Sequence, residues 1–354
     1  MRREVRSGRD PGMGGTLMEL YPCSGSRAPQ AGHTVLPSAF IFGAGLLGNL
    51  IALLILWLHK LRFRRGAAAS LFYVLVTGLT VTDLLGKCLV SPLVLLSYAR
   101  NRTLTGLTGG RGLCELFAFS MAFFGLASTL LLLAMALERW LSLGRPYLYR
   151  RLLGARAGAL LVPAVYLASL LFCGLPFLGF GHYEQYCPGT WCFFRTTEKG
   201  LPAGVLPGFS VLYGTVMGVL VLAVVLCNAS VMRHLLRMYR RQSRRGGVGS
   251  AAPAATGVEE IDQFILLALM TVLFAVCSLP LTVRTYIGAF AADFDEDADL
   301  LALRFLSLNS VVDPWVFIIF RTSVVRTYIH ALYCALQSKK SVQTELLREA
   351  GSRT

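Results

Sequence analysis

The sequence predicts an all-α membrane protein, a seven-transmembrane helix bundle followed by a short cytoplasmic amphipathic helix. Hydrophobic residues occupy 55% of the 354 positions and charged residues only 15%, with a mean hydropathy of +0.60. A soluble domain cannot bury that much apolar surface, so the bilayer is the expected solvent. Seven apolar segments are each long enough to cross a hydrocarbon core of about 30 Å as a helix, at about 1.5 Å per residue.

None of the seven segments shows the strict alternation of a barrel strand, so each is expected to be a helix. Glycine and proline occur within them; in a bundle these become kinks, because neighbouring helices satisfy the freed backbone groups. The third segment organises the chain, with Cys114 near one end and Glu138 and Arg139 at the other. The expected segments are 36–58, 70–97, 113–140, 157–179, 206–232, 262–287 and 299–320.

The connecting loops predict the orientation in the plasma membrane. The loops after the first, third, fifth and seventh segments are rich in Lys and Arg, whereas the opposite loop at 293–299 is acidic. Basic loops stay in the cytosol, so the amino terminus is expected outside and the carboxyl terminus inside. The basic amino-terminal tail departs from this pattern, but the four consistent loops outweigh it.

Four regions are expected along the chain: a disordered extracellular tail at 1–34, the bundle at 35–320, an amphipathic helix on the inner leaflet at 321–336, and a cytoplasmic tail at 337–354. Cys334 in the amphipathic helix is a candidate for palmitoylation, with an unmodified thiol as the alternative. Asn101 begins an Asn-Arg-Thr glycosylation sequon on the expected outer side.

Several classes of function are disfavoured. The net charge of +15 resides at the ends of apolar segments and not in a nucleic-acid-binding module, so no nucleic-acid partner is expected. No nucleophile–base pair, GxSxG or HExxH motif is present, which argues against an enzyme. The cysteines lack metal-ligand spacing, and no cofactor or metal is predicted. A lipid-anion transporter remains a distant alternative, although no internal repeat is visible.

Polar residues within spanning segments are costly and are therefore functional candidates. Asn49, Asp83 and Asp313 are expected to form a polar cluster holding water or a sodium ion, or else a purely structural network. Lys87 is one turn from Asp83, so the two either form an ion pair or Lys87 points toward a ligand. Arg304 needs an anion, and its planar fork suits a carboxylate; snorkelling to headgroups is the alternative.

The motifs of these segments resemble those of rhodopsin-like G-protein-coupled receptors from about residue 36 to 334. They are Gly48-Asn49, Asp83, Cys114, Glu138-Arg139-Trp140, Pro280 and Asp313-Pro314. The prostanoid receptor branch shares three departures from the usual motifs. They are Trp140 in place of tyrosine, Cys277-Ser278-Leu279-Pro280 without a tryptophan, and Asp313-Pro314-Trp315-Val316-Phe317 without a tyrosine. Residues 185–193 and 304–307 also resemble that branch.

This resemblance implies a prostanoid lipid as ligand. Arg304 would bind its carboxylate with help from Tyr98 and Thr190, Trp191 would line the lid, and Ser307 the pocket wall.

The resemblance also implies a disulfide between Cys114 and Cys192. Cys23 and Cys187 are the remaining outer pair, and we expect a second bridge there in an oxidising exterior.

Glu138 and Arg139 would form the switch toward a heterotrimeric G protein. For this branch the expected partner is the stimulatory type, which raises cyclic AMP.

Within the branch, residues 80–88, 134–144 and 286–290 are most similar to the members that bind prostaglandin D2. Lys87 is the most telling position, since an ammonium group suits the ring ketone or hydroxyl of that ligand. Residues 280–284 resemble the prostacyclin-binding members, so receptors for prostacyclin and prostaglandin E2 remain alternatives.

Overall fold

The computed structural model describes residues 21–30, 32, 34–62, 71–152, 155–197, 208–245, 253–291 and 295–321. The expected amphipathic helix, with Cys334, lies outside these ranges apart from Arg321, as does the expected tail at 337–354.

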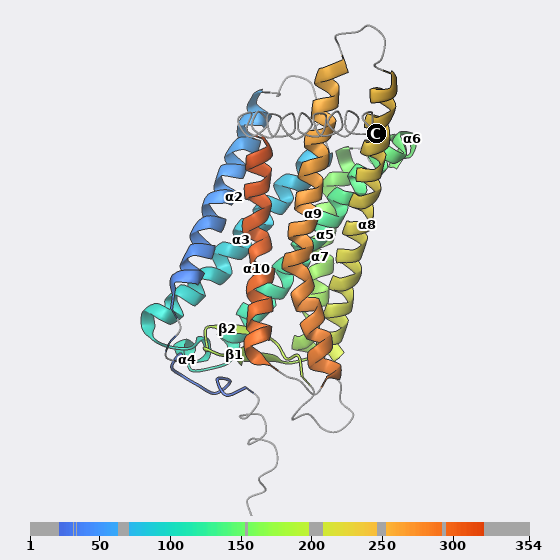
Figure 1. Cartoon of the computed structure of the whole chain (residues 1–354). Helices are drawn as coiled ribbons and strands as arrows, with labels where there is room; N and C mark the ends of the chain where they lie inside the picture. Colours follow the sequence, from blue (N-terminus) through green and yellow to red (C-terminus); the bar gives the residue numbers. More distant parts are fainter. Residues whose placement is uncertain are drawn as a thin grey trace, which may run out of the picture.

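Seven long helices form the body of the protein, as predicted (Figure 1). Each has the length and apolar composition to cross a membrane. They are α2 (Leu36–Arg62), α3 (Leu71–Arg100), α5 (Gly112–Gly144), α7 (Ala155–Cys173), α8 (Gly208–Arg245), α9 (Pro253–Phe290) and α10 (Glu296–Arg321). The short helical elements are α4 (Leu104–Thr108), α6 (Pro146–Leu152) and the 3-10 turn η1 (Leu175–Leu178).

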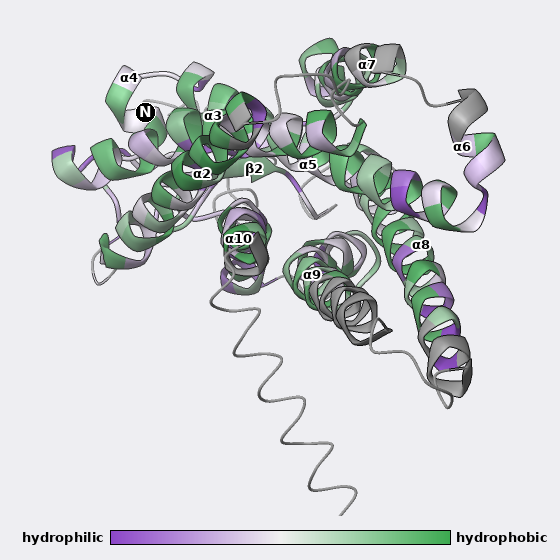
Figure 2. Ribbon diagram, turned by 90° about the horizontal axis from the view of Figure 1, so that it is seen from above, coloured by the Kyte–Doolittle hydropathy of each residue, from purple (hydrophilic) through white to green (hydrophobic). Residues whose placement is uncertain are grey.

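Helix α5 lies at the centre of the bundle. In its most hydrophobic stretch 56% of the residues are buried, more than in any other spanning helix of the described chain. Helix α10 lies between α2 and α9, and α8 packs along α9. The view along the bundle in Figure 2 shows that the long helices are hydrophobic for most of their length. Exposed side chains such as Phe40, Leu160 and Val219 therefore face the position of the lipid.

A two-stranded antiparallel hairpin covers one end of the bundle, which we call the hairpin end (Figure 1). Strands β1 (Tyr183–Tyr186) and β2 (Trp191–Phe194) pair with Gln185 opposite Cys192. The Cys114–Cys192 disulfide attaches the hairpin to α5, with 5.4 Å between the Cα atoms. The expected disulfide is therefore confirmed, and the fold is all-α except for this hairpin.

Residues 21–30 fold over the hairpin, which differs from the disordered tail expected at 1–34. The second expected disulfide, Cys23–Cys187, is present. The Gln185 side-chain amide donates to the carbonyl of Cys23 at 2.6 Å, and the Thr103 amide donates to the carbonyl of Arg27 at 3.1 Å. These bonds satisfy backbone groups that a disordered tail would leave to water.

Tyr21 anchors this segment. Its side chain is fully buried and packs edge-on against Tyr186, with 5.4 Å between ring centroids. Burial raises the pKa of Tyr21 to about 12, so its phenol remains a protonated donor at neutral pH. The hairpin end is thus closed by chain segments that are covalently joined to each other.

Candidate ligand-binding site

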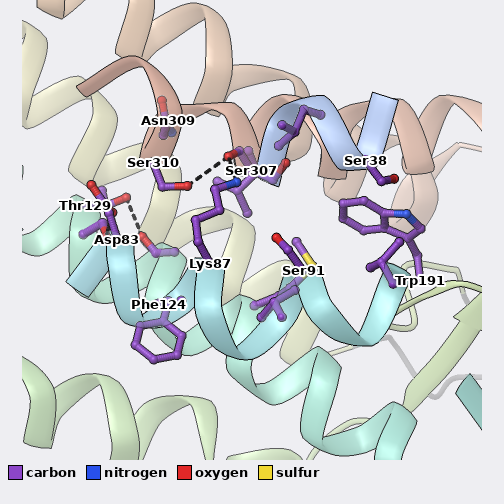
Figure 3. Close-up of a pocket in the computed structure, with 18 of the residues that line it drawn as sticks. Ser38, Asp83, Lys87, Ser91, Phe124, Thr129, Trp191, Ser307, Asn309 and Ser310 are labelled. Atoms are coloured by element: carbon purple, nitrogen blue, oxygen red, sulfur yellow. Dashed lines mark hydrogen bonds between the residues drawn. The ribbon is translucent and has the colours of Figure 1, made fainter. Parts of the chain in front are cut away.

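A cavity with an empty volume of about 830 Å³ lies between α2, α3, α5 and α10, next to the hairpin (Figure 3). Its polar lining residues are Ser38, Asp83, Lys87, Ser91, Ser128, Thr129, Ser307, Asn309 and Ser310. Its larger apolar lining residues are Ile41, Val90, Val94, Met121, Phe124, Trp191, Leu132 and Leu306.

Lys87 is the one lysine or arginine among the residues that line this cavity. It is buried, and its Nζ donates a hydrogen bond to the carbonyl oxygen of Ser307 on α10 at 2.8 Å. Figure 3 shows it reaching across from α3 toward Ser307, between Trp191 and Asp83. Gly45 on α2 leaves room for its stem, because a Cβ there would approach the Lys87 Cε to 3.1 Å.

The predicted ion pair between Lys87 and Asp83 is not among the salt bridges within the described residues. An ammonium group has three donors, and the Lys87 Nζ uses one of them on Ser307. Its other two donors have no hydrogen-bond partner among the described residues. This arrangement favours the alternative in which Lys87 serves a ligand.

The three residues of the predicted polar cluster are all buried. Asp83 accepts a hydrogen bond from the Ser128 hydroxyl at 2.7 Å, and Asn49 donates to the carbonyl of Ser310 at 2.9 Å. One oxygen each of Asn49, Asp83 and Asp313 has no hydrogen-bond partner among the described residues. These acceptors suit a water molecule or a cation, and the sodium or water site stays a prediction.

Arg304, Tyr98 and Thr190 do not line the cavity. Arg304 is half-buried on α10, one turn from Ser307 on the same helix face, toward the hairpin end. Its guanidinium has no hydrogen bond or ion pair within the described part of the chain. Tyr98 packs against the core at the hairpin end of α3. Thr190 is fully buried, and its hydroxyl lacks a partner among the described residues.

Trp191 joins the cavity to the hairpin. Its ring packs edge-on against Phe117, with 5.9 Å between centroids. The structure thus brings together three of the six predicted ligand-binding residues, Lys87, Trp191 and Ser307.

An ion pair between a half-buried arginine and a buried aspartate, on α9 and α10, was not predicted. Arg284 on α9 donates from Nε to Asp299 on α10 at 2.5 Å, and the Thr196 hydroxyl donates to the other carboxylate oxygen at 2.7 Å. These bonds join α9, α10 and the segment after β2. The sequence could have indicated Arg284, because it is an ionisable residue inside an apolar segment, as Arg304 is.

At the opposite end of the bundle, which we call the Arg139 end, a second cavity of about 1220 Å³ is lined by Arg139 and Asp313 among others. The Arg139 Nε lies 3.6 Å from the Glu138 carboxylate, and its guanidinium stacks 3.7 Å from the centroid of the Phe72 ring. The Tyr149 hydroxyl donates to Glu138 at 2.9 Å. Burial and this bond raise the pKa of Tyr149, which keeps the phenol protonated. Phe72 and Tyr149 were not predicted.

Asn101 follows α3 at the hairpin end, where it is exposed and adopts a left-handed conformation with φ of 49°. Its glycosylation stays a prediction.

Comparison with known proteins identifies the family. Residues 48–317 match the family described as "7 transmembrane receptor (rhodopsin family)". The mouse prostaglandin D2 receptor is 51% identical over 336 residues, which cover 90% of this chain and 94% of that receptor. The human prostacyclin receptor is 52% identical over 289 residues, 81% of this chain and 72% of that receptor. The chain belongs to the prostanoid receptors of the rhodopsin family.

A solved structure of squid rhodopsin has the same fold, with a TM-score of 0.61 and 16% identity over 84% of this chain and 86% of that one. Because the chain belongs to this receptor family, it is a multi-pass protein of the plasma membrane and not an enzyme. Membership of this family implies a lipid ligand and coupling to a G protein.

The contacts of Arg139 generate a prediction about basal activity of the receptor. Replacing Phe72 with leucine removes the ring under the guanidinium, a contact worth about 0.5–2 kcal/mol. We expect the Phe72→Leu receptor to hold Arg139 less firmly and to catalyse more nucleotide exchange on a purified G protein without ligand. The Phe72→Tyr receptor keeps a ring and should behave as the wild type. Equal basal exchange in the leucine and tyrosine variants would contradict the restraining role of Phe72.

Proposed function

We propose that the receptor binds prostaglandin D2 in the cavity between α2, α3, α5 and α10, with its amino terminus outside the cell. The observation that carries the proposal is the buried ammonium of Lys87, which lines this cavity and has two donors without a partner among the described residues. The relatedness to receptors named for prostaglandin D2 agrees with it.

The chemistry of the ligand fits the walls. A twenty-carbon acid buries its chains against apolar residues such as Val90, Met121 and Leu306, at about 0.8 kcal/mol per CH₂. Lys87 donates to the ring ketone or hydroxyl. The carboxylate lies toward the hairpin end, where Arg304 takes it as a forked pair and Tyr98 and Thr190 add hydrogen bonds. For this, the Arg304 side chain turns toward the cavity mouth.

The proposed orientation rests on charge. Basic residues at the described ends of α2, α5 and α8, such as Arg62, Arg145 and Arg245, belong to the Arg139 end, and the disulfides belong to the hairpin end. Basic loops stay cytosolic and disulfides persist in an oxidising exterior, so both features support an extracellular hairpin end.

The receptor acts through the stimulatory G protein and raises cyclic AMP. We expect prostaglandin D2 to raise cyclic AMP in cells that express the receptor and this G protein. The response should vanish in otherwise identical cells that lack the stimulatory G protein. A fall in cyclic AMP, or an unchanged response in the deficient cells, would contradict the proposed coupling.

Prostacyclin and prostaglandin E2 are the alternative ligands. The human prostacyclin receptor is 52% identical, although over fewer residues, and Arg284 lies in the motif at 280–284 that resembles its group. Competition binding with prostaglandin D2, prostaglandin E2 and a prostacyclin mimic separates the three.

Lys87→Met removes the ammonium but keeps an unbranched side chain of similar length. Because a hydrogen bond to a charged group contributes about 1.5–3 kcal/mol, we expect prostaglandin D2 to bind at least about tenfold more weakly. The competition assay measures this, with a prostaglandin that lacks the ring ketone as the matched ligand that should lose less. Unchanged affinity for prostaglandin D2 would remove Lys87 from ligand recognition.

Arg304→Ala tests the carboxylate contact. We expect it to weaken binding of the free acid by at least about tenfold, because the ion pair is lost, and to change binding of the methyl ester much less. Saturation binding with each ligand gives both values, and Arg304→Lys should retain part of the acid affinity. Equal losses for acid and ester would show that Arg304 serves the fold and not the carboxylate.

A further inference from the structure

A third hollow lies at the Arg139 end, between the last turns of α5 and the middle of α8. Its empty volume is about 580 Å³. Helix α5 contributes Trp140, Leu143 and Gly144, and α8 contributes a wall that includes Arg233 and Arg237. Leu143 also lines the larger cavity that contains Arg139, so the two spaces share a wall.

The α8 wall of this hollow is basic. Arg233, His234 and Arg237 all line it, and all three side chains are exposed. The hydrogen bonds of the Arg233 guanidinium stay within its own helix, to the carbonyl of Ala229 and the hydroxyl of Ser230, each at 3.3 Å. None of the salt bridges among the described residues involves these three side chains. The charges of Arg233 and Arg237 are therefore available to an anion.

The hollow lies at the level of the lipid headgroups. The apolar spans of α5 and α8 end at Gly144 and Met238, so Arg233 and Arg237 lie in the last two turns of a spanning helix. Trp140 is at the corresponding level of α5, and the Arg145 guanidinium lies 5.9 Å from its ring centroid. Tryptophan and arginine at this depth are typical of the membrane–water interface.

The same face of α8 continues into the membrane as an apolar surface. Leu226, Ser230, Arg233 and Arg237 are spaced by four, three and four residues, which places them on one stripe of the helix. Leu226 is 54% exposed within the span. A molecule with phosphate at one end and hydrocarbon at the other matches this stripe along its whole length.

We propose that this hollow binds an anionic phospholipid of the inner leaflet, with phosphate groups held by Arg233 and Arg237. The proposal rests on the orientation given above, since the cytoplasmic leaflet carries the anionic lipids. Two guanidinium groups one turn apart suit the several phosphates of a phosphoinositide better than the headgroup of phosphatidylserine, whose ammonium offsets one of its two negative charges. The acyl chains lie along the stripe that contains Leu226.

The test measures lipid binding directly, without prostanoid or G protein. The full-length receptor is placed in phosphatidylcholine nanodiscs with phosphatidylinositol 4,5-bisphosphate, with phosphatidylserine, or with neither, and retained lipid is measured by native mass spectrometry. We expect retention of the phosphoinositide, and at least about tenfold weaker retention in the Arg233→Gln/Arg237→Gln receptor. Arg240→Gln alters an exposed arginine on the same helix that does not line the hollow, and it should leave retention unchanged.

Three results would overturn the proposal. One is equal retention of the phosphoinositide by the double variant and the wild type, with thermal melting showing both to be folded. Another is full displacement of the lipid by the soluble inositol phosphate headgroup at equal concentration, which would assign the site to a free phosphate compound. The third is equal retention of phosphatidylserine and of the phosphoinositide by the wild type, which would show that the basic wall does not select several phosphates.

Discussion

A charged group buried among membrane helices has to find oxygen atoms within the protein, because the hydrocarbon around it offers none. Lys87 meets this constraint by crossing from α3 to the Ser307 carbonyl on α10, instead of pairing with Asp83 one turn away. The crossing brings the ammonium into the cavity wall, where two of its donors have no partner in the described part of the chain. This single hydrogen bond holds the ammonium in the cavity wall. Because Lys87 is the one lysine or arginine among the residues that line the cavity, it marks this cavity as the candidate site.

Two long helices connect the two ends of the receptor. Helix α5 carries Cys114 and its disulfide at the hairpin end and the Glu138–Arg139 pair at the other. Helix α10 carries Ser307 in the candidate ligand cavity and Asp313 in the Arg139 cavity, less than two turns apart. The Arg284–Asp299 pair fixes α9 to α10 at the hairpin end. A ligand that bonds to Lys87 is therefore connected, through Ser307, to a helix that is packed against both α2 and α9.

The sequence predicted the seven helices well, because length and hydropathy alone decide whether a helix spans a bilayer. It did not predict the fold of residues 21–30, where burial of Tyr21 and side-chain bonds from Gln185 and Thr103 overcome a composition rich in glycine and proline. Such contacts join positions more than 70 residues apart, so they cannot be predicted from local composition.

For the polar residues, too, the sequence predicted which side chains are buried but not the contacts they make. Their presence inside apolar segments identified Lys87, Asp83 and Asp313 as buried and functional candidates. The direction in which each points depends on helix rotation and on space left by neighbours, such as Gly45 beside the Lys87 stem. For that reason the sequence left two interpretations of Lys87 open, and Phe72 under Arg139 was missed because an aromatic residue in an apolar helix is unremarkable by composition.

An electron cryomicroscopy structure of the receptor with bound prostaglandin D2 tests the central claim most directly. We expect ligand density between α3 and α10, with the ring within hydrogen-bond distance of the Lys87 Nζ and the carboxylate directed toward Arg304. Ligand density elsewhere, for example between α8 and α9, with Lys87 still bonded only to Ser307, would contradict the assignment of this cavity as the prostanoid site.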